Sequence, residues 1–320
     1  MKTTSKLTLF GFAGVVLATV FLFGSCSKKS SSGPPPPVLL GGYISSDSVE
    51  PTHLIGYWPF NGDANDHAGG LTATVAGSIT YGTGVRGQAY QGATGTYATY
   101  TPPATFPAML ASYTLTFWYK IPSQVDTNTT QGVFFYSGAT QQGELINEFE
   151  APANKNLAGD SLRVHPGFWD IGDNPNYALF VPETFDTNAI AKWEFFTVEY
   201  NGGTSTYQTF QNAVPTGAQT AFSPPAPAGP PPPPSPYPGS YITPNPLWTD
   251  GGKGTPLGPL KFTDAPAAGG LIIGSWPDGL FGQKAATANY LGLLDDVRLF
   301  NEALTQTQIS GLFLNGQAGR

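Results

Sequence analysis

The segment from Leu291 to Phe313, LGLLDDVRLFNEALTQTQISGLF, decides the fold of this 320-residue chain. In its first part apolar and polar residues mostly alternate, which is the period of a β-strand with one face in a core. Asp295 and Asp296 are adjacent in this strand, so they are expected to point to opposite faces. Because burial of an uncompensated carboxylate is costly, the buried one should meet a cation, a row of backbone N–H groups or a metal.

A short helix is expected directly after this strand. Thr305 has the side chain of an N-cap, and Gln308 stands three residues later, at the spacing of a capping box. The apolar stripe of this helix consists of Ile309, Leu312 and Phe313. The segment therefore predicts a strand followed by one short C-terminal helix.

The rest of the sequence predicts an all-β protein. It contains 40 glycines and 31 prolines, and short runs rich in Tyr, Phe, Thr and Val lie between turn signals. The expected strands are Leu54–Phe60, Thr72–Tyr81, Gln88–Gln91, Thr96–Thr101, Ser112–Ile121, Gly132–Ser137, Glu144–Glu150, Ser161–His165, Tyr177–Val181, Glu194–Tyr200, Thr204–Gln211, Leu271–Gly274 and Tyr290–Asn301. Together they would form one sandwich of about 260 residues, a size that single all-β domains reach.

Four segments in the same order resemble laminin-G-like, concanavalin A-type jelly rolls. The closing strand and helix resemble the C-terminal pattern of that family in Asp295-Asp296-Val297-Arg298, Phe300-Asn301 and Ala303-Leu304. The other matching residues are Gly56 to Asp66 in an opening strand, Tyr113, Leu115, Phe117, Trp118 and Lys120 in a middle strand, and Trp193, Phe195, Val198, Tyr200, Asn201 and Gly202 in a later strand and turn. The resemblance implies a two-sheet antiparallel jelly-roll sandwich. It leaves the function open, because this fold hosts lectins, glycosidases and structural modules.

The N-terminus predicts export. Lys2 and Lys6 precede an apolar run that ends at Phe23, and a Gly-Ser pair and Cys26 follow, so residues 1–25 have the features of a signal peptide. Cys26 is the only cysteine and resembles the lipidated cysteine of a bacterial lipoprotein of the Bacteroidota type. The alternative is an ordinary secretory signal with an incidental cysteine.

Residues 26–50 are expected to be a lipidated cysteine with a Ser- and Pro-rich tether, and residues 51–320 the jelly-roll domain. Ser27 stands where a signal for retention in the inner membrane would favour Asp, so the resemblance implies an outer-membrane lipoprotein. Lys28 and Lys29 stand where a surface-export signal would carry acidic residues. The sequence therefore leaves open whether the domain faces the cell surface or the periplasm.

Composition argues against one class of partner. The net charge is −7 and charged residues are 11% of the chain, whereas binding of nucleic acid needs basic patches.

Residues 214–266 hold 16 of the 31 prolines, which predicts an insertion into the domain. This insertion would be either an extended surface excursion, available to a protein partner, or a scaffold that folds Tyr237, Tyr241 and Trp248 over the sandwich as part of a ligand surface.

A metal site is one candidate for chemistry. Asp63 and Asp66 lie in a turn with exposed carbonyl groups, which are the hard oxygen ligands that Ca²⁺ prefers. The resemblance implies that the first and last strands are neighbours and that Asp295 could share a structural Ca²⁺ with this turn. The alternative is that the two turn aspartates make Asx-turns and that Asp295 pairs with Arg86 or Arg298. The three histidines, His53, His67 and His165, are scattered and predict no metal cluster.

Catalysis has weaker support. Glu144, Glu148 and Glu150 share one strand face, as the paired carboxylates of a retaining glycosidase would, but Asn147 lies on the opposite face and no Asp lies between them.

Ligand binding is favoured instead, because sugar recognition combines an aromatic ring with nearby Asp or Asn side chains. The expected ligand-binding residues occur in two loops and are Phe168, Trp169, Asp170, Asp173, Asn174, Trp276 and Asp278. For each of the two tryptophans, the alternative is that it caps an end of the sandwich.

These observations favour a non-catalytic carbohydrate-binding or adhesion module, held at the outer membrane by a lipid anchor, with a glycan or envelope polysaccharide as its ligand. The alternatives are a structural or assembly protein of the envelope without a sugar site, and a glycoside hydrolase.

Overall fold

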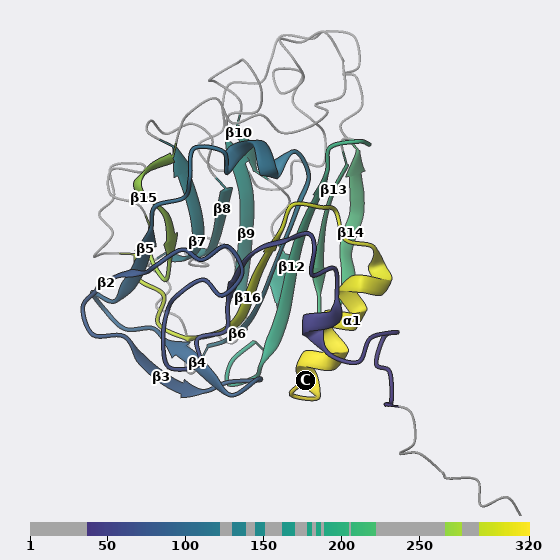
Figure 1. The fold of residues 1–320 in the computed structure, drawn as a ribbon, viewed down its shortest axis with the longest axis horizontal. Helices are drawn as coiled ribbons and strands as arrows, with labels where there is room; N and C mark the ends of the chain where they lie inside the picture. Colours follow the sequence, from purple (N-terminus) through teal and green to yellow (C-terminus); the bar gives the residue numbers. More distant parts are fainter. Residues whose placement is uncertain are drawn as a thin grey trace, which may run out of the picture. The chain divides into compact units, whose positions relative to one another are not determined.

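The computed structural model describes residues 37–121, 130–138, 145–150, 162–169, 178–180, 184–186, 189–204, 206–221, 266–276 and 288–320. Val38–Arg320 form one compact unit that contains two antiparallel sheets and a C-terminal helix (Figure 1). The predicted all-β sandwich is therefore confirmed. Within the described ranges, no helix has the length and apolar character needed to cross a membrane.

In the described part of the chain, each sheet contains eight strands. Sheet I has the order β14 (Val214–Ala221), β13 (Thr206–Gln211), β12 (Glu194–Asn201), β6 (Tyr113–Lys120), β16 (Leu293–Phe300), β4 (Gln88–Gln91) and β3 (Thr80–Thr83), with β1 (Leu54–Trp58) also paired to β16. Sheet II has the order β10 (Ala178–Phe180), β9 (Leu162–Trp169), β8 (Leu145–Glu150), β7 (Gln131–Gly138), β15 (Pro266–Ile273), β5 (Tyr97–Tyr100) and β2 (Thr74–Ala76), with β11 (Thr184–Asp186) paired to β9. The remaining elements are η1 (Ser46–Ser48), η2 (Pro107–Leu110) and α1 (Gln306–Gln317).

The structure differs from the expected strands in several places. β9 continues to Trp169 because β8 and β10 pair with its last residues, so the expectation that Phe168 and Trp169 lie in a loop is wrong. β15 begins at Pro266, before the expected Leu271. The single strand expected at 72–81 is two strands, β2 in sheet II and β3 in sheet I, because Gly77 turns the chain with a φ of +66°. β11 and β14 were not expected. The stretch 214–266 begins as β14, in which Pro215 is tolerated because β14 is an edge strand, and it ends where β15 begins. Residues 222–265 lie outside the described part.

The core between the sheets is rich in aromatic residues. Trp58 on β1 packs edge-on against Tyr100 and Phe134, with ring centroids 5.6 and 5.8 Å apart. β1 belongs to sheet I, whereas β5 and β7 belong to sheet II, so this one fully buried ring joins the two layers. The prediction that Trp58 is a core residue is confirmed.

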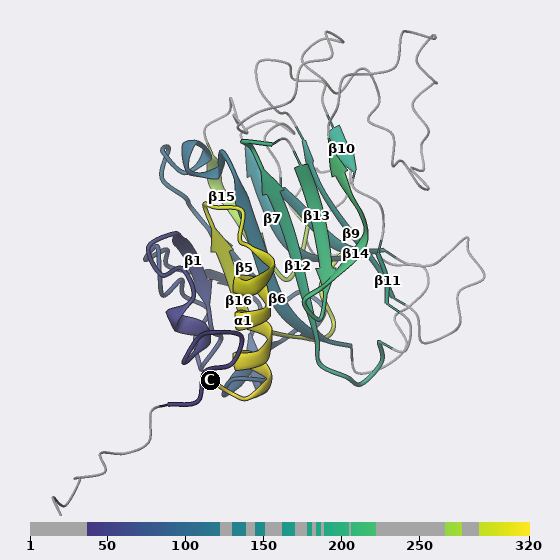
Figure 2. The ribbon, with the colours of Figure 1, turned by 90° about the vertical axis from the view of Figure 1, so that its right-hand side faces the viewer.

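Helix α1 covers the face of sheet I that is turned away from sheet II (Figures 1 and 2). Its capping box is formed, because the backbone N–H of Gln308 donates to the Thr305 hydroxyl and the Gln308 side chain accepts from the Thr305 N–H. Phe313 stacks on Trp118 of β6, with centroids 5.5 Å apart. The predicted helix, its cap and its apolar stripe are therefore confirmed.

Strand β16 departs from the expected alternation at its two aspartates. Its register against β6 shifts between Asp295 and Arg298, and Asp296 has a φ of +50°, so this residue is the extra one in a β-bulge. The bulge places both carboxylates on the side of Arg86: Asp295 binds its backbone N–H and Asp296 binds its guanidinium. The expectation that the two aspartates point to opposite faces is therefore wrong, because the inserted residue breaks the two-residue period.

Candidate functional site

Arg86, Arg298, Asp47 and Asp296 form an ion-pair network at the bulge. Oδ1 of Asp296 accepts hydrogen bonds of 2.9 Å from both Arg86 and Arg298, and both arginines also donate to Asp47. The Arg298 guanidinium lies 4.1 Å from the ring centre of Tyr57. Burial favours the neutral form of Asp296, but the two arginines outweigh burial and hold its pKa below the ordinary value. The two positive and two negative charges balance, so the network acts as a structural clasp between η1, β1 and β16.

Asp295 has a different environment. Oδ2 of its carboxylate accepts the backbone N–H groups of Val85 and Arg86 at 2.6 and 2.9 Å, whereas its buried Oδ1 has no hydrogen-bond partner. Burial, together with the nearby charge of Asp296, raises the pKa of Asp295 to about 7, although the backbone hydrogen bonds act in the opposite direction. Both carboxylates are buried, and each meets a partner of the expected kind: Asp295 meets backbone N–H groups and Asp296 meets two arginines.

The two turn aspartates make local hydrogen bonds. Oδ1 of Asp66 accepts the N–H groups of Tyr57, Ala68 and Gly69 at 2.8 to 3.0 Å, and Oδ1 of Asp63 accepts the N–H of Asn65 at 2.8 Å. These are the Asx-turns of the alternative interpretation.

The structure does not gather the carboxylates predicted to hold calcium. The donor atoms of Asp63, Asp66 and Asp295 are not all within 4.8 Å of one another. A calcium site shared by these three residues therefore does not fit the arrangement of their donors, and calcium binding stays a prediction for calorimetry on chelator-treated protein.

Sheet II presents a polar pair on its outer face. Phe149 of β8 and Val164 of β9 belong to the core between the sheets, so the adjacent residues Glu148 and His165 point away from that core. They are directly opposite in the register of β8 and β9, and Nδ1 of His165 lies 3.5 Å from Oε1 of Glu148. Both side chains are buried. A carboxylate and an imidazole are thus held together by two rigid strands.

Trp276 lies beside this pair. Gly132 of β7 is opposite Glu148, and a Cβ atom on Gly132 would approach Cδ1 of Trp276 to 2.6 Å. Glycine is needed at this position because the backbone of Ser275, at 2.4 Å from such a Cβ, and the indole of Trp276 together occupy the space of a side chain. Trp276 also packs against Phe135, with centroids 5.8 Å apart, and is only 7% exposed. We call Glu148, His165 and Trp276 the sheet II site.

The two predicted ligand loops leave sheet II at different levels. Phe168 is opposite Leu145 in the register, whereas Trp276 lies beside Gly132, at the level of Glu148. These levels are three residues apart, which corresponds to roughly 10 Å along a strand. The side chains of Phe168 and Trp169, and all of Asp170, Asp173, Asn174 and Asp278, lie outside the described part. Sequence reasoning did not identify His165 as a partner of Glu148, because only the pairing of β8 with β9 brings them together.

One further group of donors has the composition of a metal site. Among the described residues, Glu50, His53 and Glu302 are the only set of three His, Cys, Asp or Glu donors that lie within 4.8 Å of one another. Sequence analysis treated His53 as an isolated histidine. No local signal could have shown otherwise, since Glu302 lies in a distant part of the chain.

Comparison with known proteins supports the fold. No protein-family model and no curated protein matches the sequence. The binding domain of botulinum neurotoxin DC, solved with rat synaptotagmin II, is 12% identical with a TM-score of 0.50, covering 84% of this chain and 53% of that chain. The binding domain of Paraclostridial mosquitocidal protein 1 is 11% identical with a TM-score of 0.50, covering 82% and 52%.

A third similar structure is domain 4 of AbnA, an extracellular arabinanase from Geobacillus stearothermophilus, solved with arabinotriose. It is 17% identical with a TM-score of 0.46, covering 81% of this chain and 97% of that chain. This chain spans about half the length of the two toxin binding domains. Together with the two antiparallel sheets, the likeness to the two toxin binding domains shows that this chain has a jelly-roll sandwich fold.

Proposed function

We propose that this protein is a carbohydrate-binding or adhesion module and that the sheet II site, whose three side chains are buried, lies at the base of its ligand surface. The observation that carries the proposal is the juxtaposition of Glu148, His165 and Trp276 on the face of sheet II turned away from sheet I. A carboxylate and an imidazole exchange hydrogen bonds with sugar hydroxyls, and an indole packs on the C–H face of a sugar ring. The use of the same fold for binding domains in two toxins is consistent with this proposal.

The position of Trp169 extends the proposal. Trp169 follows His165 by four residues on β9, and Gly167, which lies between them in the strand, has no side chain. A glycan chain that contacts the sheet II site could therefore continue along β9 toward its last residue, Trp169, and the predicted ligand residue Asp170 that follows it in the sequence. We also propose that a lipid attached to Cys26 holds the domain at the outer membrane.

A glycan array probed with the whole chain tests the proposed function. We expect Trp276→Ala and Glu148→Gln to reduce binding at least tenfold, and Glu199→Gln to leave it unchanged. Glu199 is a matched control, because it lies on β12 of sheet I, where its neighbours Val198 and Tyr200 face the core. Absence of glycan binding, or equal binding by all variants, would favour the structural envelope protein instead.

Two further assays test the remaining parts. If the wild type releases reducing ends from polysaccharides and Glu148→Gln does not, the protein is a glycoside hydrolase and not a non-catalytic module. Labelling of cells with a radioactive fatty acid should mark the wild-type protein but not Cys26→Ser; no label on the wild type would support an ordinary secretory signal.

A further inference from the structure

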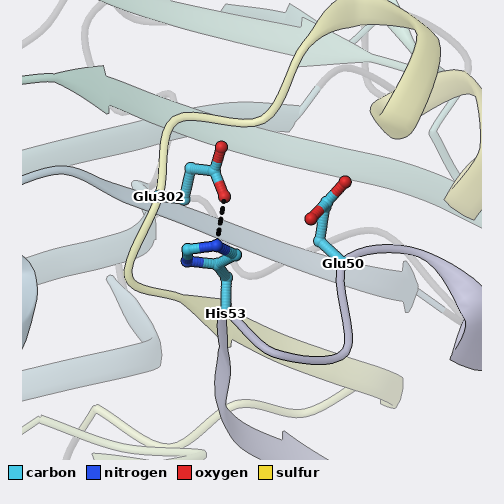
Figure 3. Close-up of side chains that lie close together, drawn as sticks. All are labelled: Glu50, His53 and Glu302. Atoms are coloured by element: carbon cyan, nitrogen blue, oxygen red, sulfur yellow. Dashed lines mark ion pairs between the residues drawn. The ribbon is translucent and has the colours of Figure 1, made fainter.

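We propose that Glu50, His53 and Glu302 form a site for a divalent transition-metal ion of the zinc type, which fastens the beginning of β1 to the end of β16. The site is independent of the sheet II site, since it lies at the other sheet. Figure 3 shows the three side chains converging from the turn before β1 and from the segment after β16. One imidazole and two carboxylates are a ligand set that zinc accepts.

The distance between the first two ligands suits a shared ion. Nε2 of His53 lies 3.2 Å from Oε2 of Glu302. Two ligands of a tetrahedral zinc ion, each bonded at about 2.0 to 2.1 Å, are separated by about 3.3 Å. An ion could therefore bind both atoms without movement of the backbone. Glu50 offers the third donor, within 4.8 Å of the donor atoms of His53 and Glu302.

The hydrogen-bond partners of His53 leave a place for a cation. Nδ1 lies 3.1 Å from Oδ1 of Asn301, an acceptor, so Nδ1 carries a hydrogen. Nε2 faces the carboxylate of Glu302, which is also an acceptor, and Oε2 of Glu302 has no other partner. A neutral imidazole has only one N–H. With the hydrogen on Nδ1, the lone pairs of Nε2 and of the Glu302 carboxylate face each other unless a cation lies between these two atoms. A proton would satisfy the contact as well, and the experiment below separates the two.

Residues behind the three ligands hold two of them in place. Asn301 accepts from His53 and also donates its backbone N–H to the His53 carbonyl at 2.9 Å. The side-chain amide of Gln308, the capping-box residue of α1, donates to Oε1 of Glu50. Outer residues of this kind fix the tautomer and the orientation of metal ligands. Three protein ligands leave the fourth position to water, and an ion can enter from solvent because the side chains of His53 and Glu302 are 45% and 39% exposed.

The position of the site gives it a structural role. Leu54, the first residue of β1, is opposite Phe300, the last residue of β16. His53 and Glu302 lie just beyond that pair, at the end of the ladder that joins the first and last strands of the domain. A bound ion would therefore hold this end of the ladder closed and stabilise the folded state relative to the unfolded chain.

Isothermal titration of the whole chain with zinc chloride, after treatment with a chelator, tests the proposal. We expect one site, and a rise of about 5 °C in the melting temperature when free zinc is about a hundred times the dissociation constant. His53→Ala and Glu302→Gln should each weaken zinc binding at least tenfold. Melting of these variants without metal shows whether they are folded.

His67→Ala is the matched control. Nε2 of His67 lies 3.1 Å from Oδ1 of Asp63, and both side chains are 44% exposed, so this pair closely resembles the His53–Glu302 pair. Among the described residues, however, the His67–Asp63 pair has no third donor nearby. The variant should therefore bind zinc like the wild type. Absence of heat and of any rise in melting temperature for the wild type overturns the proposal, and so does equal binding by Glu302→Gln. Binding of calcium without zinc also overturns it.

Discussion

Replacement of Asp295 by Asn should stabilise the protein above neutral pH and leave it almost unchanged in acid. Burial raises the pKa of this carboxyl from its ordinary 3.8 to about 7. The folded state therefore holds a proton that the unfolded chain loses between pH 4 and pH 7. Because the folded state binds more protons in this range, Asp295 lowers the free energy of unfolding as the pH rises. The destabilisation is absent below about pH 4 and complete above about pH 7.

The magnitude follows from the two pKa values. A tenfold difference in proton affinity corresponds to about 1.4 kcal/mol, so the interval between 3.8 and about 7 corresponds to at most about 4 kcal/mol at pH 8. An asparagine carries no charge at any pH, and its side-chain oxygen can still accept the N–H groups of Val85 and Arg86. We therefore expect the free energy of unfolding of Asp295→Asn to be higher than that of the wild type by about 2 to 4 kcal/mol at pH 8. At pH 4 the two free energies should agree within about 1 kcal/mol.

Urea unfolding followed by tryptophan fluorescence between pH 4 and pH 8.5 measures both proteins. Asp296→Asn is the matched control, because Asp296 pairs with both arginines and the loss of its charge leaves positive charge in excess at a buried place. This control should be less stable than the wild type by about 3 to 5 kcal/mol at pH 8. A lower stability of Asp295→Asn at pH 8 would refute the reasoning, since it would mean that the charged form of Asp295 is compensated by a bound cation.

Three other changes test the packing and the helix. Gly132→Ala should lower the melting temperature and weaken glycan binding, because the new methyl group collides with the backbone of Ser275 and with the indole of Trp276; differential scanning calorimetry and the glycan array measure the two effects, and unchanged values would contradict the placement of the Ser275–Trp276 segment against β7. Asn147→Leu should raise the free energy of unfolding by about 1 to 3 kcal/mol in urea, because the buried amide of Asn147 has no hydrogen-bond partner; a loss of stability would mean that this amide has one. Thr305→Ala should cost about 1 kcal/mol through loss of the N-cap and increase hydrogen exchange in the first turn of α1; unchanged exchange would show that the cap is not needed.

The sequence predicted most strands because a two-residue hydrophobic period is a local property. Gln88–Gln91 has the same bounds in the sequence analysis and in the structure, and the capping box of α1 was predicted residue by residue. β14 was missed because the prolines that follow it dominate the composition of its surroundings.

The candidate sites were predicted less completely. The sequence placed Glu148 and Asn147 on opposite faces of one strand, as the structure does, because strand parity needs no partner. It did not pair Glu148 with His165, and it missed the Glu50, His53 and Glu302 group. Each of these contacts joins residues from different elements, and their proximity depends on how the strands pair.

By itself, the sequence determined that this chain forms an antiparallel sandwich closed by a strand and a short capped helix, since periodicity, turn residues and caps act over a few residues. The tertiary structure alone decided what the closing strand does with its two aspartates. The bulge at Asp296 directs both carboxylates to one side, where Asp296 pairs with two arginines and Asp295 accepts backbone N–H groups. The physical reason is that burial and charge pairing arise only when β16 lies between β6, β4 and β1.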